Sequence, residues 1–310
     1  MRIIIVDEMH SSIVEMPKEL GLDVDYFPNI AFDEVLEKVG EYDGLIIRSK
    51  FLIDEKFLSS ARKLKFIGRA GAGLDLIDLE ACKKAKVTVF GANEANKVAV
   101  SEHLIGMILS LFHKINTGSR EVKLGEWNRE TNRGEELADK TVGIIGYGNN
   151  GQATAERLVA FGCKILAYDK YKYGFGNHLI KECDLAEIYE KADVVSLHIP
   201  LTSITDRWVN SDFLNSFRKP IYLCNIARGE IVVLRDLVAA LKAGKVKGAC
   251  LDVLENEKLK TMSDEQKIAF DFLRYNDNVI LTPHVAGWST ESYIKINNVL
   301  KDKIKRFIEK

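Results

Sequence analysis

Short apolar runs alternate with segments of helical periodicity along the whole chain. Runs of this kind predict buried strands at residues 2–7, 44–49, 65–70, 87–90, 141–147, 164–169, 194–199, 221–227, 248–254 and 279–282. Continuous apolar strands that alternate with helices are typical of parallel sheets covered on both faces. The pattern therefore predicts an α/β fold with two doubly wound domains, built from four or five strand–helix units before residue 98 and about six after residue 140.

Three further segments shape the expected organisation. Residues 97–115 give the longest clean helical pattern and are predicted to join the two halves, whereas residues 116–140 are polar and read as an irregular excursion. Residues 289–309 again have helical periodicity, with Ser289 or Thr290 as the expected N-cap.

Composition narrows the class of protein. The 310 residues include 44 basic and 45 acidic side chains, so the chain lacks the basic surplus that nucleic-acid-binding proteins usually carry, and no nucleic-acid partner is expected. No uninterrupted apolar run approaches the roughly 18 residues of a membrane span, and no signal peptide is expected. Five dispersed cysteines without a C-x-x-C pair predict reduced core thiols, a cytoplasmic protein and no structural zinc.

A glycine-rich segment follows the first apolar run of the second half. Residues 141–151 read TVGIIGYGNNG, so Gly146, Gly148 and Gly151 form G-x-G-x-x-G between a predicted strand and a helical pattern. The first glycine permits a tight turn, the second lets the backbone approach a pyrophosphate, and the third lets the helix pack on the strand. The helix N-terminus then presents free N–H groups to the phosphates. The segment predicts a dinucleotide site.

Asp169 ends the next apolar run, 18 residues after the last glycine of the motif. An acidic side chain there accepts hydrogen bonds from the adenine ribose and repels the 2′-phosphate of NADP, which favours NAD. Lys170 and Lys172 follow closely and offset part of that charge, so NADP stays open as the alternative. Asn150 stands where an apolar residue more often packs inward, and the sequence leaves open whether it reaches the pyrophosphate.

Polar side chains gather where the later predicted strands end. Arg228, Glu257 and His284 are 29 and 27 residues apart, about one strand–helix unit each, and functional groups of open α/β sheets collect at the carboxyl ends of strands. Arg228 can hold the carboxylate and carbonyl oxygen of a 2-oxo acid with its planar fork. His284 can exchange the hydroxyl proton, and Glu257 can orient the imidazole ring. The set suits hydride transfer between a 2-hydroxy acid and a nicotinamide.

The sequence also resembles the D-isomer-specific 2-hydroxyacid dehydrogenases, and most closely their phosphoglycerate dehydrogenase-like members. The motifs that carry this resemblance are IIRSK (46–50), GRAGAGLDLID (68–78), GYGNNG (146–151), LHIPLT (197–202), NIARGEIV (225–232), LDVLENE (251–257) and LTPHVAGW (281–288). The resemblance implies a Rossmann NAD domain, residues 98–284, inserted into a flavodoxin-like substrate domain of residues 1–97 and 285–310. It also implies a homodimer in which 97–140 wraps the partner's NAD domain.

The family's functional residues map onto this chain one by one. The catalytic arginine, glutamate and histidine map onto Arg228, Glu257 and His284. The resemblance implies cofactor contacts from Gly146, Gly148, Asn149, Asn150, Gly151, Asp169, Ile199, Pro200, Ile226, Ala227, Arg228, Asp252, His284 and Gly287. It implies substrate contacts from Arg48, Ser49, Ala72, Gly73, Asn96, Arg228 and His284, with Gly71 and Gly73 leaving backbone N–H groups bare for an anion.

Two features leave alternatives open. Lys258 replaces the proline that usually follows the catalytic glutamate, and Glu255 is a near neighbour of Glu257. Arg48, Lys50 and Arg69 are candidates for a phosphate site, which would suit 3-phosphoglycerate, whereas glyoxylate or hydroxypyruvate reduction needs none. Formate oxidation is disfavoured because that branch carries glutamine in place of Glu257. A corepressor-like, NAD-sensing binding protein is the alternative from another functional class.

Overall fold

The computed structural model describes residues 1–309, which fold as two compact units. One unit comprises residues 1–96 and the segment from 288 onward, and the other comprises residues 97–287. The sequence had placed the boundaries at 97/98 and 284/285, so the units divide within one and three residues of those positions. The chain thus leaves the first unit, folds the second without interruption, and returns to the first.

The first unit is built on a five-stranded parallel sheet in the order β2-β1-β3-β4-β5. This order is that of flavodoxin-like folds. Its strands are β1 (Arg2–Ile5), β2 (Asp23–Tyr26), β3 (Gly44–Ile47), β4 (Phe66–Arg69) and β5 (Thr88–Gly91). Its helices are α1 (Ser12–Glu19), α2 (Phe32–Lys38), α3 (Glu55–Ser60), α4 (Leu79–Lys84) and α12 (Thr290–Ile308). Ser289 is the N-cap of α12, and its side chain accepts a hydrogen bond from the Ser292 N–H.

The second unit contains a seven-stranded parallel sheet in the order β12-β11-β10-β9-β6-β7-β8. Its strands are β6 (Thr141–Ile145), β7 (Lys164–Tyr168), β8 (Ile180–Glu182), β9 (Val194–Leu197), β10 (Ile221–Asn225), β11 (Val246–Leu251) and β12 (Val279–Leu281). Its helices are α5 (Lys97–Phe112), α6 (Ile115–Lys123), α7 (Asn149–Ala160), α8 (Leu185–Lys191), α9 (Ser211–Asn215), α10 (Leu234–Lys242) and α11 (Asp264–Arg274). The direction of strand addition reverses between β6 and β9, and ligands of open α/β sheets bind at such a switch point.

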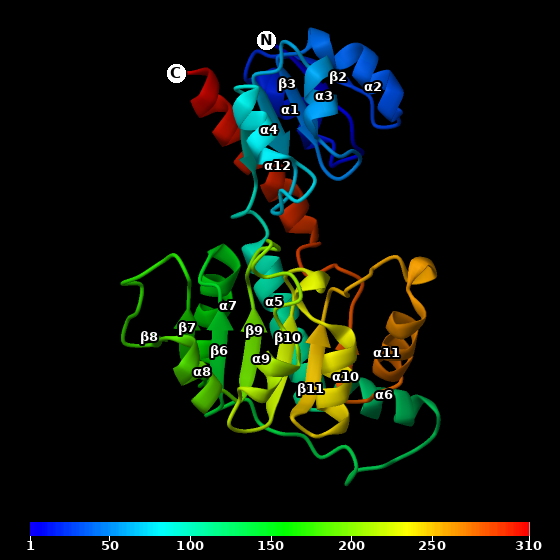
Figure 1. The fold of residues 1–310 in the computed structure, drawn as a ribbon, viewed down its shortest axis with the longest axis vertical. Coiled ribbons are helices and arrows are strands. Elements are labelled where there is room, and N and C mark those ends of the chain that lie inside the picture. The colour runs from blue at the N-terminus through cyan, green and yellow to red at the C-terminus, as the bar shows by residue number, and fades with distance from the viewer. Residues whose placement is uncertain (310) are drawn as a thin grey trace. The chain divides into compact units, whose positions relative to one another are not determined.

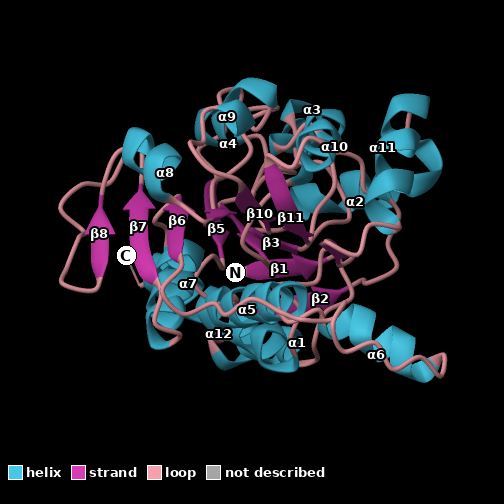
Figure 2. Cartoon of the chain, turned by 90° about the horizontal axis from the view of Figure 1, so that it is seen from below, coloured by secondary structure: helices cyan, strands magenta, loops and turns pink. Residues whose placement is uncertain are grey.

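Each sheet buries an apolar cluster on both of its faces. In the first unit α1 and α12 cover one face, while α2, α3 and α4 cover the other. In the second unit α5 and α7 pack on one face, and α8, α9 and α10 on the other. Figure 1 shows these layers in each unit, and Figure 2 shows α7 and α8 on opposite sides of the β6–β8 edge. Burial on both faces explains why the central strands are uninterrupted apolar runs.

The structure adds elements that the hydrophobic pattern did not reveal. β2 and β8 are missing from the sequence-based prediction, and both are edge strands in which polar residues interrupt the apolar ones. The segment expected to be irregular after residue 115 begins with helix α6, none of whose residues is buried. The polar stretch after Glu257 contains helix α11, whose capping box at Ser263 and Gln266 fixes its start. Each of these elements buries too little to leave a clear apolar signature.

Within the described residues, no single helix has the length and apolar character needed to cross a membrane. The bent pair α5 and α6, which meet at 62°, passes that test only when taken together. Half of α5 is buried in the core of the second unit.

Candidate active site

The glycine-rich loop connects β6 to α7 at the switch point of the larger sheet. Gly146 has a φ of +96°, and a Cβ there would lie 2.5 Å from the carbonyl oxygen of His198. A Cβ at Gly151 would lie 2.0 Å from the carbonyl oxygen of Gly146. Both positions therefore accept only glycine, because backbone atoms occupy the space that any side chain would need.

Gly148 differs from these two glycines in that its surroundings are open. A Cβ built there meets no atom within 4 Å, so the backbone faces empty space directly before the first residue of α7. Asn149 is exposed at this helix start, and Asn150 keeps a buried side-chain oxygen without a hydrogen-bond partner. An open, glycine-lined helix N-terminus fits a pyrophosphate, because unpaired N–H groups and the helix dipole both favour an anion.

Asp169 follows β7 and closes the loop from the other side. Its carboxylate accepts hydrogen bonds from the N–H groups of Tyr147 at 2.8 Å, Tyr171 at 2.9 Å and Lys172 at 3.0 Å. The Lys172 ammonium donates to the Tyr147 carbonyl at 3.1 Å. The acid thus fixes the turn next to the glycine loop, and Lys172 is already tied to that loop. Whether Asp169 also contacts a ribose stays a prediction.

His284 and Glu257 form a direct pair after β12 and β11. The imidazole Nδ1 lies 2.9 Å and 3.0 Å from the two carboxylate oxygens. Both side chains are 47% exposed, so the pair faces solvent on the sheet's carboxyl edge. Because Nδ1 points at the carboxylate, Nε2 is the nitrogen left to meet a reactant. The geometry matches an acid–base histidine oriented by a carboxylate.

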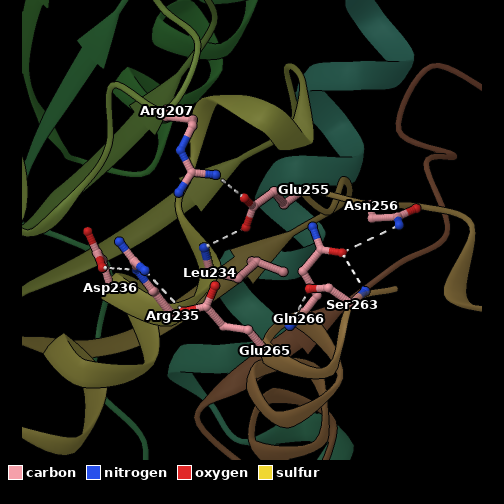
Figure 3. A network of polar contacts seen from close by, with 9 residues as sticks. All are labelled: Arg207, Leu234, Arg235, Asp236, Glu255, Asn256, Ser263, Glu265 and Gln266. Atoms are coloured by element: carbon pink, nitrogen blue, oxygen red, sulfur yellow. Dashed lines mark hydrogen bonds and ion pairs between the residues drawn. The ribbon is translucent and has the colours of Figure 1, made fainter. Parts of the chain in front are cut away.

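Glu255, the competing acid, points elsewhere (Figure 3). It forms an ion pair with Arg207 and accepts a hydrogen bond from the Leu234 N–H at 3.2 Å. Its side chain is only 13% exposed. The structure therefore resolves the ambiguity that the sequence left: Glu257, and not Glu255, is the acid beside His284.

Arg228 lies at the end of β10, which neighbours β11 in the sheet. The fully buried Asn225 holds this loop by donating to the Arg228 carbonyl at 2.8 Å and accepting from the Ala227 N–H at 3.1 Å. Gly229 packs against the loop after β11, because a Cβ there would lie 1.8 Å from the Leu254 carbonyl oxygen. The loops that carry Arg228 and Glu257 are thus in contact.

Asp252 is buried with 1% exposure beneath the His284 turn. Its carboxylate accepts from the N–H groups of Val285 at 2.9 Å and Ala286 at 2.8 Å, and from the Thr282 hydroxyl at 2.6 Å. The sequence predicted a cofactor contact for Asp252, which stays a prediction. The structure shows that this carboxylate supports the turn that carries His284.

In the first unit, the candidate substrate residues follow the strand ends of the smaller sheet. Asp7 accepts hydrogen bonds from the N–H groups of Arg48 at 2.6 Å and Ser49 at 3.2 Å. The Lys50 ammonium donates to the backbone carbonyls of Val6 and Pro28, so its hydrogen bonds are made within the first unit. The Arg48 guanidinium stacks on the Trp288 ring, 3.7 Å from its centroid, and burial lowers its pKa. The Arg48 guanidinium also lies 5.7 Å from the centroid of the Tyr293 ring, so two aromatic side chains hold it.

The Gly71–Gly73 loop follows β4. The Arg69 guanidinium lies directly over Gly71, where a Cβ would fall 1.5 Å from Nη1, and Ala72 and Gly73 are half-buried. Asn96 has a buried side-chain oxygen without a partner. The Gly71 N–H donates to the Arg69 carbonyl at 2.8 Å, so the expectation of a bare N–H group at Gly71 is wrong. That Ala72 and Gly73 bind the substrate carboxylate stays a prediction.

Sequence reasoning missed four residues that shape these loops: Asp7, His103, Thr282 and Trp288. Two of them could have been found from the sequence: Asp7 is an acid at the end of a predicted strand, and Thr282 directly precedes Pro283. It also gave no role to His198, which follows β9 and precedes the predicted cofactor residues Ile199 and Pro200. Burial lowers the pKa of His198 to about 3, and its ring contacts Ser196 Oγ at 2.9 Å.

Comparison with known proteins agrees with this geometry. The sequence model described as "D-isomer specific 2-hydroxyacid dehydrogenase, NAD binding domain" matches residues 105–286. The D-3-phosphoglycerate dehydrogenase of Methanocaldococcus jannaschii is 33% identical over 99% of this chain and 57% of that protein. The hydroxypyruvate reductase of Thermotoga maritima is 33% identical over 88% of this chain and 87% of that protein. The chain thus spans little more than half the length of its phosphoglycerate dehydrogenase relative.

A solved structure of D-lactate dehydrogenase from Aquifex aeolicus, complexed with NAD and lactic acid, superposes with a TM-score of 0.83. The two sequences are 28% identical, and the superposition covers 99% of this chain and 95% of that structure. The chain therefore belongs to the D-isomer specific 2-hydroxyacid dehydrogenase family, with an NAD-binding domain formed by its larger sheet.

Proposed function

We propose that this protein is an NAD-dependent dehydrogenase that interconverts a D-2-hydroxy acid and its 2-oxo acid. The observation that carries the proposal is the His284–Glu257 pair. The two residues follow the neighbouring strands β12 and β11, and the loop of Glu257 contacts the loop of Arg228. Glu257 engages Nδ1 of His284, so Nε2 is the ring nitrogen to which we assign the proton transfer.

The chain's own residues have separate tasks in this reaction. Bound NAD supplies the hydride acceptor. During oxidation His284 Nε2 removes the hydroxyl proton, and in the reverse direction it returns that proton to the carbonyl oxygen. Glu257 holds Nδ1, which fixes the ring orientation and stabilises the charge that the imidazole gains.

Arg228 orients the substrate. Its planar guanidinium presents several N–H donors, so it can bind the carboxylate while polarising the carbonyl oxygen at C2. The Asn225 side chain fixes the backbone on both sides of Ala227, so the arginine starts from a rigid loop. Ala72 and Gly73 are the proposed backbone ligands of the substrate carboxylate.

We further propose 3-phosphoglycerate and phosphohydroxypyruvate as the substrate pair, which would place the enzyme in serine biosynthesis. Arg48 supports this choice, since its guanidinium is held on Trp288 at the strand ends of the first unit. Lys50 favours the alternative, hydroxypyruvate or glyoxylate, because its ammonium is bonded to the carbonyls of Val6 and Pro28 and adds no phosphate ligand.

The test is the rate of NADH oxidation with phosphohydroxypyruvate, hydroxypyruvate and glyoxylate, for the wild type and for Arg48→Met. Methionine keeps an apolar side chain on Trp288 but removes the charge. We expect the phosphorylated acid to be preferred, and the variant to raise its KM at least tenfold without changing the KM for glyoxylate. Turnover of the unphosphorylated acids alone would replace the substrate assignment. NADH binding without turnover of any acid would favour an NAD-sensing binding protein.

A homodimer is the proposed assembly. Four large apolar side chains on and after α6 are exposed: Ile115, Val122, Leu124 and Trp127. Apolar exposure on one short segment marks an interaction surface, and a second copy is the partner proposed by resemblance to the family. Sedimentation of the wild type as a dimer and of a Val122→Glu/Leu124→Glu variant as a monomer would support it; a monomeric wild type at micromolar concentration would refute it.

The proposed compartment is the cytoplasm. All five cysteines are free thiols in the structure, and four of them are buried. Unpaired thiols are typical of a reducing compartment.

A further inference from the structure

The buried residue Asp252 accepts hydrogen bonds from three consecutive N–H groups of the turn that carries His284. His284 has a φ of +56°, a left-handed conformation that is uncommon for residues other than glycine and persists only where surrounding contacts impose it. The Asp252 carbonyl accepts from the His284 N–H at 2.7 Å, and the Asp252 carboxylate accepts from the N–H groups of Val285 and Ala286. The orientation of His284 therefore depends on where Asp252 lies.

Asp252 is in turn connected to a histidine on α5. The Thr282 hydroxyl lies 2.6 Å from Asp252 Oδ1 and 3.0 Å from His103 Nε2, and His103 Nε2 is 3.6 Å from the same carboxylate oxygen. A carboxylate only accepts, so the hydroxyl proton points at Asp252. The threonine oxygen must then accept from His103, which places a proton on Nε2 of that ring.

This chain of hydrogen bonds joins distant parts of the second unit. His103 lies on α5, the first helix of the unit, whereas Thr282 and His284 belong to its last turn. The His103 side chain is 26% exposed, and the carboxylate it approaches is 1% exposed. A buried carboxylate such as that of Asp252 needs hydrogen-bond donors around it. The His103 imidazole N–H is a donor that comes from outside the turn of residues 282–286.

We propose that His103 is a positioning residue for the reaction: through Thr282 it fixes the Asp252 carboxylate, and through that carboxylate it fixes the backbone of the His284 turn. The inference rests on the proposed function. It assigns His103 no contact with substrate or cofactor. Its effect should appear in the chemical step, because the orientation of His284 matters most there.

The experiment compares four test variants and one control variant with the wild type. His103→Leu removes the donor, His103→Gln retains an Nε2–H at similar reach, and Thr282→Val removes the link at equal size. His103→Leu/Thr282→Val closes the double-mutant cycle. His113→Leu is the matched control, because His113 is an exposed histidine just after α5 and outside these contacts. Steady-state kinetics, the NADH dissociation constant and the melting temperature are measured for each.

We expect His103→Leu to lower kcat about tenfold, equivalent to about 1.4 kcal/mol in the barrier. NADH affinity should change less than twofold. His103→Gln should recover most of kcat, and the double variant should be no slower than Thr282→Val alone. Equal damage from leucine and glutamine, strict additivity in the double variant, or a parallel loss of NADH binding would overturn the proposal.

A second readout does not require turnover. Imidazole nitrogen NMR of the six histidines reports ring tautomers directly. His103 should carry its proton on Nε2, and the His284 signals should move in both His103→Leu and Thr282→Val but not in His103→Gln. Unchanged His284 signals in the first two variants would refute the proposal even if the protein turned over no 2-oxo acid, so the two failures are distinguishable.

Discussion

Gly229 is the point at which the loops of Arg228 and Glu257 touch, and a single methyl group there tests whether their spacing matters. In Gly229→Ala the new Cβ would lie 1.8 Å from the Leu254 carbonyl oxygen and 2.1 Å from its carbonyl carbon. Side-chain carbons do not approach closer than 3.0 Å, so the two backbones must separate by more than an ångström. A misplacement of about 1 Å costs on the order of a hundredfold in rate where reacting groups must be aligned.

We therefore expect kcat to fall about a hundredfold in Gly229→Ala, while NADH affinity changes little, because the glycine loop after β6 is untouched. Gly106→Ala is the matched control. A Cβ at Gly106 meets nothing within 4 Å in the interior of α5, so this change should stabilise the fold by about 1 kcal/mol and leave kcat unchanged. Kinetics, NADH titration and thermal unfolding distinguish the outcomes. Full activity in a folded Gly229→Ala protein would refute the claim that loop contact sets the active geometry.

Three further predictions concern the cofactor loop, pH and thiol reactivity. Gly148→Ala should weaken NADH binding at least tenfold without lowering the melting temperature, because its Cβ enters only open space at the start of α7; unchanged NADH binding would mean that the phosphates lie elsewhere. Burial lowers the pKa of His198 from 6.5 to about 3, so between those pH values the unfolded chain binds a proton that the folded protein does not. Stability is then fully present above pH 6.5 and falls by about 1.4 kcal/mol per pH unit below it, or about 2 kcal/mol by pH 5. Urea unfolding should show this loss in the wild type and not in His198→Gln; equal slopes would show that His198 is not the group responsible. Burial raises the pKa of the half-buried Cys183 thiol to about 11, so at pH 8 iodoacetamide should alkylate it on the order of a hundredfold more slowly than a free cysteine. Rapid alkylation of Cys183 in the native protein would contradict that environment.

The elements that sequence reasoning found, and those it missed, follow from how much apolar surface each buries. β3 is buried at all four positions and β9 likewise, and such runs were unmistakable. β2 is only half-buried at the edge of its sheet, so its sequence DVDY gives no continuous apolar run. No residue of helix α6 is buried, so its apolar positions do not pack against a core and the helix was not predicted. The strands that are buried on both faces could therefore be predicted from the sequence.

The candidate site divides in a similar way. Residue type and spacing were enough to single out Arg228, Glu257 and His284 as candidates, because each follows one of three neighbouring strands of the larger sheet. Spacing did not decide between Glu255 and Glu257, since that depended on Arg207, which reaches Glu255 from another loop. His103 gave no signal at all, because its partner Thr282 lies 179 residues away along the chain. Contacts of that kind are determined by tertiary packing.

The central claim is that His284, paired with Glu257, moves the proton while hydride passes to or from C2. The most direct test combines turnover with product stereochemistry: NADH consumption with the best 2-oxo acid of the panel, and chiral analysis of the hydroxy acid formed, for the wild type and His284→Asn. We predict a product of the D configuration, a loss of kcat of at least a thousandfold in the variant, and NADH affinity within a few-fold of the wild type. An L product, or an active His284→Asn enzyme, would contradict the account.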